Sequence, residues 1–132
     1  MFEHLQRRLY HLSPWIVRAL IPVDYIGTYT LYRFREEEPS YIDRSDTCLR
    51  NRLLAHARTK RADYFDYDIQ WTIEKCFIAE CSAYHALIDK SENLIHPALP
   101  KGLHLKCSFC LSTFEQARKD RITFSLEKYF TC

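Results

Sequence analysis

Five side chains of this 132-residue sequence have the residue types that chemistry on a phosphate group needs. Arginine offers a fixed positive charge for a phosphate, and tyrosine or histidine can orient or deprotonate a nucleophile. One carboxylate can hold Mg²⁺, which keeps several of its water ligands in protein sites. The five candidates are Tyr29, Tyr41, Arg52, His56 and Glu80.

Each candidate also has an ordinary structural interpretation. Hairpin tyrosines usually pack in a core or at a sheet edge, and an arginine and a histidine one helical turn apart usually lie on the surface. A glutamate on the apolar side of a helix is more often a salt-bridge partner than a metal ligand. The combination of the five, rather than any one of them, makes them candidates.

Two predicted strands carry the tyrosines. Residues 27–34 are rich in threonine and aromatic side chains, the acidic segment 35–39 is typical of a turn, and residues 40–42 supply a second strand. This pattern predicts a hairpin with Tyr29 on its first strand and Tyr41 on its second.

Two predicted helices carry the other three candidates. Residues 49–59 have helical periodicity after a cap at residues 46–48, and place Arg52 one turn before His56. Residues 67–73 alternate as a half-buried strand, and residues 74–89 return to helical periodicity. Glu80 lies on the apolar side of this last helix, where a carboxylate is costly unless it is paired, hydrogen-bonded or bound to a cation.

The remaining segments complete the predicted order of elements. The pattern of residues 1–22 predicts a helical extension, with Ser13 and Pro14 at a helix start. The pattern of residues 98–132 predicts an irregular tail with a short helix at 112–118. The central order of strand, strand, helix, strand, helix predicts one α+β or α/β domain on a small mixed sheet.

Composition limits the class of protein more than the kind of partner. The chain has 19 Lys+Arg against 17 Asp+Glu, and a net charge of +2 says little about partners. Its content of 47% hydrophobic residues excludes a disordered or collagen-like chain. The apolar stretch 15–26 is interrupted by Arg18, Pro22 and Asp24 and is too short to span a bilayer. We expect no membrane span, no secretory signal, a cytoplasmic location and reduced cysteines. No pattern indicates the oligomeric state.

The order and spacing of the candidate residues resemble the GIY-YIG nuclease superfamily over about residues 23–97. The resemblance implies an α+β fold with a small three-stranded mixed sheet flanked by helices, with the helical extension 1–22 before it and the tail 98–132 after it. It rests on Gly27-Thr28-Tyr29, Tyr41-Ile42-Asp43, Leu49-Arg50-Asn51-Arg52-Leu53 with His56, and Ala79-Glu80.

The resemblance also implies an activity and a role for each residue. Tyr29 and Tyr41 match the tyrosines of the first two motifs, Arg52 and His56 match the arginine and histidine of the helix, and Glu80 matches the metal-binding glutamate. The implied function is a DNA endonuclease that hydrolyses a phosphodiester with one Mg²⁺ or Mn²⁺ ion. A basic stretch could follow the DNA backbone, and its residues are Arg44, Arg50, Arg58, Lys60 and Arg61. A solvated helix face is the more frequent reason for such a stretch.

One position departs from the family pattern. Asp43 stands where the second motif has glycine, and it adds a side chain and a negative charge near the expected phosphate. Asp43 could be an added metal ligand, an inactivating change or a substitution that slows cleavage. The alternative function is therefore a catalytically silent nucleic-acid-binding or protein-interaction module of the same fold.

The tail contains half of a zinc-binding pattern. Cys107 and Cys110 form a Cys-x-x-Cys pair, and His96, His104 and Cys132 could supply further ligands. A lone pair of this kind is more often a coincidence than a site. A zinc-binding structural domain unrelated to nucleases remains the third alternative.

Overall fold

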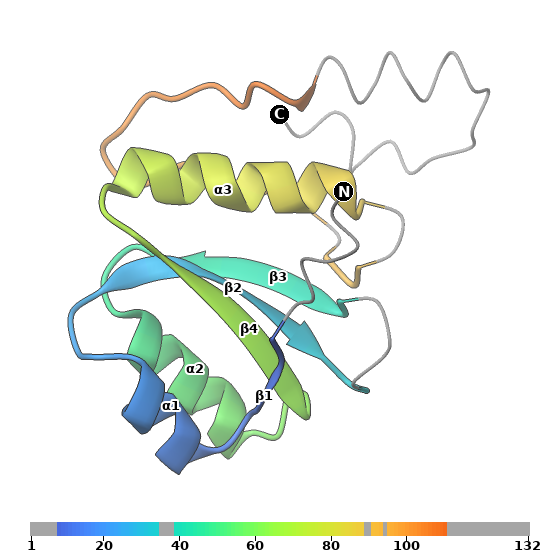
Figure 1. Ribbon diagram of the computed structural model, residues 1–132. Coiled ribbons are helices and arrows are strands. Elements are labelled where there is room, and N and C mark those ends of the chain that lie inside the picture. The colour runs from blue at the N-terminus through green and yellow to red at the C-terminus, as the bar shows by residue number, and fades with distance from the viewer. Residues whose placement is uncertain (1–7, 35–38, 89–90, 94, 111–132) are drawn as a thin grey trace.

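The computed structural model describes residues 8–34, 39–88, 91–93 and 95–110. The strands form one sheet, and helices cover both of its faces (Figure 1). Helix α3 covers one face of the sheet, and helices α1 and α2 lie against the other. The elements are β1 (Tyr10–His11), α1 (Pro14–Leu20), β2 (Ile26–Tyr32), β3 (Tyr41–Ser45), α2 (Leu49–Arg58), β4 (Tyr64–Gln70) and α3 (Ile73–Ala86).

The α+β class is confirmed, but the predicted three-stranded mixed sheet is wrong. The sheet has four strands in the order β1-β4-β2-β3, and every neighbouring pair is antiparallel. The extra strand β1 lies inside the segment predicted to be helical, where it pairs Tyr10 with Phe65 and His11 with Tyr64. Two residues are too few to show an alternating pattern, so only the partner strand reveals this element.

Helix α1 agrees with the predicted start and end of a helix. Ser13 is its N-cap residue, Pro14 occupies the first turn, and Ile21 caps it just before Pro22. Proline suits the first turn because its missing N–H has no acceptor there. The predicted helix at 112–118, together with Cys132, falls outside the described residues.

The core lies between the sheet and helices α1 and α2. Alternate residues of β2 and β4 point toward it, and apolar side chains of both helices meet them. Fully burying one such side chain stabilises the fold by about 1.5–3 kcal/mol before entropy losses are counted. The buried cluster consists of Val17, Ile21, Tyr29, Leu31, Leu49, Leu53, Leu54 and Phe65.

Gly27 lets strand β2 approach its neighbours closely. A Cβ atom at this position would lie 2.3 Å from the carbonyl oxygen of Asp68 on β4 and 3.0 Å from a methyl carbon of Leu49 on α2. No side chain fits in that space, so glycine is required two residues before Tyr29. The first motif therefore has a packing function that does not depend on chemistry.

The ends of β4 and α2 differ slightly from the predictions. Strand β4 starts at Tyr64 rather than 67 and ends at Gln70, because Thr72 caps α3 by accepting a hydrogen bond from the Lys75 backbone N–H at 3.1 Å. Helix α2 has Cys48 as its N-cap residue, inside the predicted cap 46–48, and the Ser45 hydroxyl accepts from the Cys48 N–H at 3.0 Å. Among the described residues no helix has the length and apolarity to cross a bilayer.

Candidate functional site

The hairpin register places two candidate tyrosines next to Asp43. Tyr29 on β2 pairs directly with Asp43 on β3, and Tyr41 lies two residues earlier on the same face of β3. Side chains on alternate residues of a strand share a face, so all three point toward α2. Helix α2 then brings Arg52 and His56 to them from above the sheet.

One oxygen atom of Asp43 lies within hydrogen-bonding distance of three donors. Its Oδ2 is 3.2 Å from the Tyr29 hydroxyl, 3.2 Å from the Tyr41 hydroxyl and 2.7 Å from Nη2 of Arg52. Its Oδ1 accepts from the Arg44 backbone N–H at 2.8 Å. Donors that converge on one oxygen in this way form a cradle for an anion. We call Tyr29, Tyr41 and Arg52 the anion cradle.

His56 completes a hydrogen-bonded chain behind the cradle. Its Nε2 lies 2.7 Å from the Tyr29 hydroxyl. A proton on Nε2 lets His56 donate to Tyr29 while Tyr29 donates to Asp43, which satisfies all three groups. Burial and, secondly, the positive charge of Arg52 lower the pKa of His56, so the imidazole is neutral at pH 7.

Both tyrosines remain protonated in this arrangement. Burial is the main cause that raises the pKa of Tyr29 and of Tyr41, and the negative charge of Asp43 is the second. Tyr29 is 1% exposed, whereas Tyr41 is half-buried. With Asp43 in place, the phenols act as hydrogen-bond donors rather than as bases.

Glu80 is buried close to Asp43, on the helix that covers the opposite face. It is 4% exposed, and its carboxylate accepts from Nη1 of Arg44 at 2.6 Å. Arg44 also pairs with Asp46 at 2.9 Å and lies over the Phe77 ring. Burial and then the charge of Asp43 raise the pKa of Glu80 to about 7, in spite of its ion pair with Arg44.

The five candidate residues therefore come together, and two further residues join them. Asp43 was noted in the sequence as a departure from the family pattern, with its role left open, and it is the residue that contacts the whole cradle. Arg44 was predicted to bind DNA, yet it is buried beside Glu80 and forms part of the site's interior. Strand alternation could have found this difference, since Arg44 and Asp43 must point to opposite faces of β3.

The other predicted DNA-binding residues have different degrees of exposure. Arg58 and Lys60 are exposed at the end of α2, and Arg50 is half-buried. The Arg61 guanidinium lies 4.8 Å from the centre of the Tyr41 ring and 3.3 Å from the Glu92 carboxylate. Arg61 thus borders the anion cradle directly.

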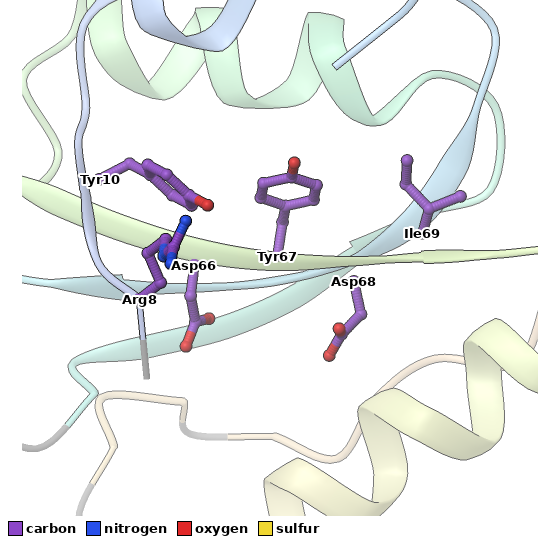
Figure 2. Close-up of a pocket in the computed structure, with 6 residues that line it drawn as sticks. All are labelled: Arg8, Tyr10, Asp66, Tyr67, Asp68 and Ile69. Carbon is purple, nitrogen blue, oxygen red and sulfur yellow. The ribbon is translucent and has the colours of Figure 1, made fainter. Parts of the chain in front are cut away.

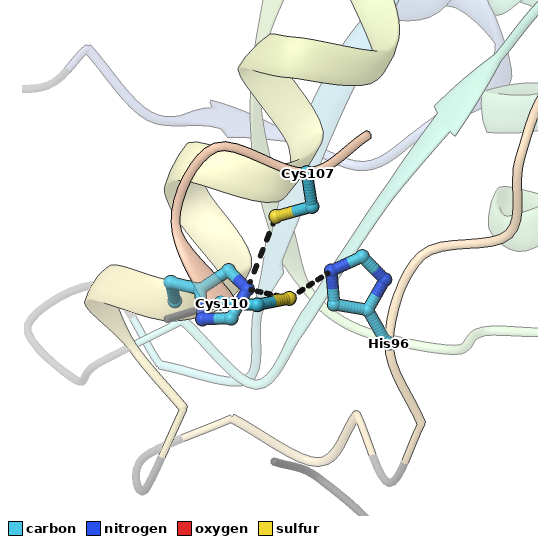
Figure 3. A group of neighbouring side chains, drawn as sticks. His96, Cys107 and Cys110 are labelled. Carbon is cyan, nitrogen blue, oxygen red and sulfur yellow. Dashed lines mark hydrogen bonds between the residues drawn. The ribbon is translucent and has the colours of Figure 1, made fainter. Parts of the chain in front are cut away.

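A second group of side chains could hold a metal ion, and its chemistry suits zinc better than magnesium. The donor atoms of His85, His96, Cys107 and Cys110 all lie within 4.8 Å of one another. Figure 3 shows His96, Cys107 and Cys110 pointing toward one another. His96 and the two cysteines were sequence candidates, whereas His104 does not belong to the group. His85 was missed because it lies on a helix, far from the cysteines in the sequence.

The two histidines of this group are neutral at pH 7. Burial and, secondly, the neighbouring His96 lower the pKa of His85 to about 4, and burial lowers the pKa of His96. Neutral imidazole is the form that binds a metal. Cys107 is a free thiol, whereas Cys110 is disulfide-bonded in this structure and must be reduced before it can serve as a ligand.

A pocket of about 380 Å³ lies elsewhere, beside β1 and β4 (Figure 2). Tyr67 and Ile69 point to one side of β4, and Asp66 and Asp68 point to the other. None of the five sequence candidates lines this pocket. This pocket therefore does not point to the anion cradle.

Comparison with known proteins adds no relative. No protein-family model matches the chain, and no curated protein or solved structure matches it significantly. The functional interpretation therefore depends on the motif residues and on the geometry of the anion cradle.

Proposed function

We propose that this protein is a GIY-YIG-type DNA endonuclease that hydrolyses a phosphodiester bond with the help of one Mg²⁺ or Mn²⁺ ion. The observation that carries the proposal is the convergence of Tyr29, Tyr41 and Arg52 on one anionic oxygen, with Glu80 close by. A phosphate oxygen needs the same donors as the carboxylate oxygen that they now hold.

Arg52 is the residue that binds the scissile phosphate. Half of its side chain is exposed, so a DNA backbone can reach the guanidinium without unfolding the site. Positive charge fixed in position before the reaction stabilises the extra negative charge of the transition state. Removing such a group costs about a hundredfold or more in rate.

The tyrosines and His56 orient the nucleophile and accept its proton. Tyr41 is the better exposed phenol and contacts the incoming water. Once a phosphate has displaced Asp43, the buried Tyr29 hydroxyl can pass a proton to His56 Nε2, 2.7 Å away, when the imidazole proton is on Nδ1 and the lone pair is on Nε2. Neutral His56 has one nitrogen lone pair that can accept a proton. This role requires the imidazole to stay neutral at working pH, which its lowered pKa supports.

The carboxylate of Glu80 suits a divalent metal ion, because Mg²⁺ prefers oxygen ligands and keeps several waters. The Glu80 carboxylate bonds to Arg44 through Oε1, and a carboxylate has about four acceptor sites, so capacity for an ion remains. When bound, the ion would stabilise the developing charge and the leaving oxygen. Arg44 and the buried surroundings hold Glu80 in one position.

Asp43 competes with the substrate for the anion cradle. Two like charges about 4 Å apart repel by roughly 4 kcal/mol at the effective dielectric of a protein surface. A DNA phosphate must therefore displace the Asp43 carboxylate before it contacts Arg52. We expect slow cleavage by the natural sequence and faster cleavage once Asp43 is removed.

The test measures cleavage of duplex, branched and single-stranded DNA with Mg²⁺, with Mn²⁺ and with EDTA. Glu80→Gln should abolish metal-dependent cleavage and keep the fold, and Glu74→Gln, an exposed glutamate of the same helix, should behave as the wild type. Arg52→Ala should lower the rate far more than the DNA affinity, with exposed Arg18→Ala as its control. Full activity of a folded Glu80→Gln or Arg52→Ala variant would refute the proposed roles.

Asp43 also favours a second candidate function, a silent binding module. In the anion cradle the protein's own carboxylate takes up the Tyr29 and Tyr41 hydroxyls and Nη2 of Arg52, which a substrate phosphate would otherwise contact. If the wild type and Asp43→Gly both fold and bind DNA, yet neither cuts any substrate with either metal, this second function replaces the first.

A further inference from the structure

We propose that His85, His96, Cys107 and Cys110 form a structural zinc site, separate from the anion cradle. Three short separations between sulfur and nitrogen donors join them into one cluster: Cys107 Sγ to His85 Nε2 is 3.3 Å, Cys110 Sγ to His85 Nε2 is 3.4 Å, and Cys110 Sγ to His96 Nε2 is 3.5 Å. Figure 3 marks the contact between Cys110 and His96 with a dashed line.

The distances match a tetrahedral zinc ion. Zinc binds sulfur at about 2.3 Å and nitrogen at about 2.0–2.1 Å, so a tetrahedral ion separates its sulfur and nitrogen ligands by about 3.6 Å. The observed separations of 3.3–3.5 Å need only a small expansion to admit the ion. All four donor atoms already lie within 4.8 Å of one another.

The ligand types select zinc and a structural role. Two thiolates and two imidazoles favour zinc over Mg²⁺, which prefers oxygen ligands. Four protein ligands leave no open position for a substrate, which is typical of structural zinc sites. Both histidines are 8% exposed and the cysteines are half-buried, so the site lies under the surface.

The site would tie an irregular segment to the helix that carries Glu80. His85 lies in the last turn of α3, five residues after Glu80, and the other three ligands come from residues 95–110. In residues 91–93 and 95–109 the described chain forms only bends, turns and irregular backbone. A metal crosslink is one way to hold such a segment in place without a core of its own.

Zinc binding requires reduced cysteines. Cys110 is disulfide-bonded in this structure, so the disulfide and the zinc site are alternative states of the same thiol. Cys81 is a neighbouring free thiol, with its Sγ 4.0 Å from His96 Nε2 and outside the four-residue group. The experiment must therefore keep the protein reduced and must test whether Cys81 replaces a ligand.

The first measurement is the zinc content of the full chain, purified under a non-thiol reductant and without added chelator. We expect about one zinc ion per wild-type chain. Removing a residue that only hydrogen-bonds to a metal ligand weakens metal binding about 10–100-fold. Removing a ligand itself should cost more, so Cys107→Ser and His85→Ala should each lose more than about a hundredfold in zinc affinity. Cys48→Ser, at a buried free thiol on α2's N-cap, should keep its zinc, as should Cys81→Ser.

The second measurement decides the question if a ligand variant fails to fold. Reduced, metal-free wild-type protein is titrated with Co²⁺, which gives the absorption bands of a tetrahedral thiolate site when two cysteines and two histidines bind it. The proposal is overturned by a folded, reduced wild type that holds no zinc and shows no cobalt bands. Undiminished zinc in folded Cys107→Ser would overturn it equally.

Discussion

At the scale of single residues, Asp43 is the side chain that most affects the anion cradle. It replaces the expected glycine, and its one oxygen Oδ2 lies within bonding distance of Tyr29, Tyr41 and Arg52. A single carboxylate thus occupies the donors on which the proposed activity depends. Two predictions about individual side chains follow from this arrangement.

Asp43→Gly should bind duplex DNA at least about tenfold more tightly and should cut it faster, because one repulsive charge near the phosphate is removed. Fluorescence anisotropy at fixed salt measures the affinity, and gel assays with Mg²⁺ measure the rate. Asp24→Asn, at an exposed aspartate in the turn before β2, is the control for net charge. Unchanged affinity would show that Asp43 does not compete with DNA, and tighter binding with lost cleavage would make it a metal ligand.

His56 should stay neutral at pH 7, since burial and Arg52 lower its pKa below 6.5. Below about pH 6.5 this histidine is protonated in the unfolded chain but stays neutral in the folded protein, so protonation favours unfolding. The contribution of neutral His56 to stability is therefore present above about pH 6.5 and is lost as the pH falls. The difference in unfolding free energy between wild type and His56→Gln should therefore shrink between about pH 7.5 and about pH 5. A constant or growing difference would contradict this assignment, and NMR titration of the imidazole measures the pKa directly.

At the scale of elements, caps and close contacts position the site residues. Thr72 fixes where α3 begins, and hence which of its faces carries Glu80 toward the sheet. Gly27 fixes how closely β2 approaches β4 and α2. Neither residue contacts the anion cradle, so their substitution should change stability before it changes chemistry.

Thr72→Ala should destabilise the protein by about 1 kcal/mol, because the Lys75 N–H loses its side-chain acceptor. Ser82→Ala, at an exposed position inside α3, is the matched control and should be neutral or slightly stabilising. Urea unfolding monitored by circular dichroism gives both values. Equal effects in the two variants would mean that the cap contributes nothing to α3.

Gly27→Ala should destabilise the fold by about 1–3 kcal/mol or more, because the new methyl group meets the Asp68 carbonyl oxygen. Gly102→Ala makes a useful comparison, since its φ is +81° and nothing lies within 4 Å of the added carbon. Only backbone strain, worth about 1 kcal/mol, acts at that position. A smaller loss at Gly27 than at Gly102, measured in the same urea series, would contradict the packing argument.

At the scale of the whole molecule, one sheet separates two groups of functional residues. The anion cradle is built from β2, β3 and α2, and the group of His85, His96, Cys107 and Cys110 is built from the end of α3 and the segment that follows it. Glu80 and His85 share helix α3, which is packed on β2 and β3. The stability of that helix therefore affects both groups.

Removing zinc from the reduced protein should lower the free energy of unfolding. A ligand present at about 1,000 times its dissociation constant stabilises the folded state by about 4 kcal/mol, so a chelator should lower the melting temperature by several degrees. Adding Zn²⁺ back should restore it, and Mg²⁺ should not. A melting temperature unaffected by chelator in protein shown to hold zinc would mean that the ion does not support the fold.

Much of the local structure was predictable because it is encoded over a few neighbouring residues. The hairpin, α2 and the apolar stripe of α3 follow from periodicity, and α1 follows from Ser13 and Pro14. The five candidate residues were identified by type and spacing, and they lie together in the fold. The sequence by itself thus determined these elements and the five candidate residues.

Only the tertiary structure decided how these parts combine. Strand β1 exists because β4 offers it a partner, Asp43 occupies the cradle because β2 and β3 align it with Tyr29, and Arg44 pairs with Glu80 across two elements. His85 joins the cysteines because the chain after α3 folds back on that helix. These contacts link residues far apart in the chain, and such contacts leave no periodic signal in the sequence for a local pattern to detect.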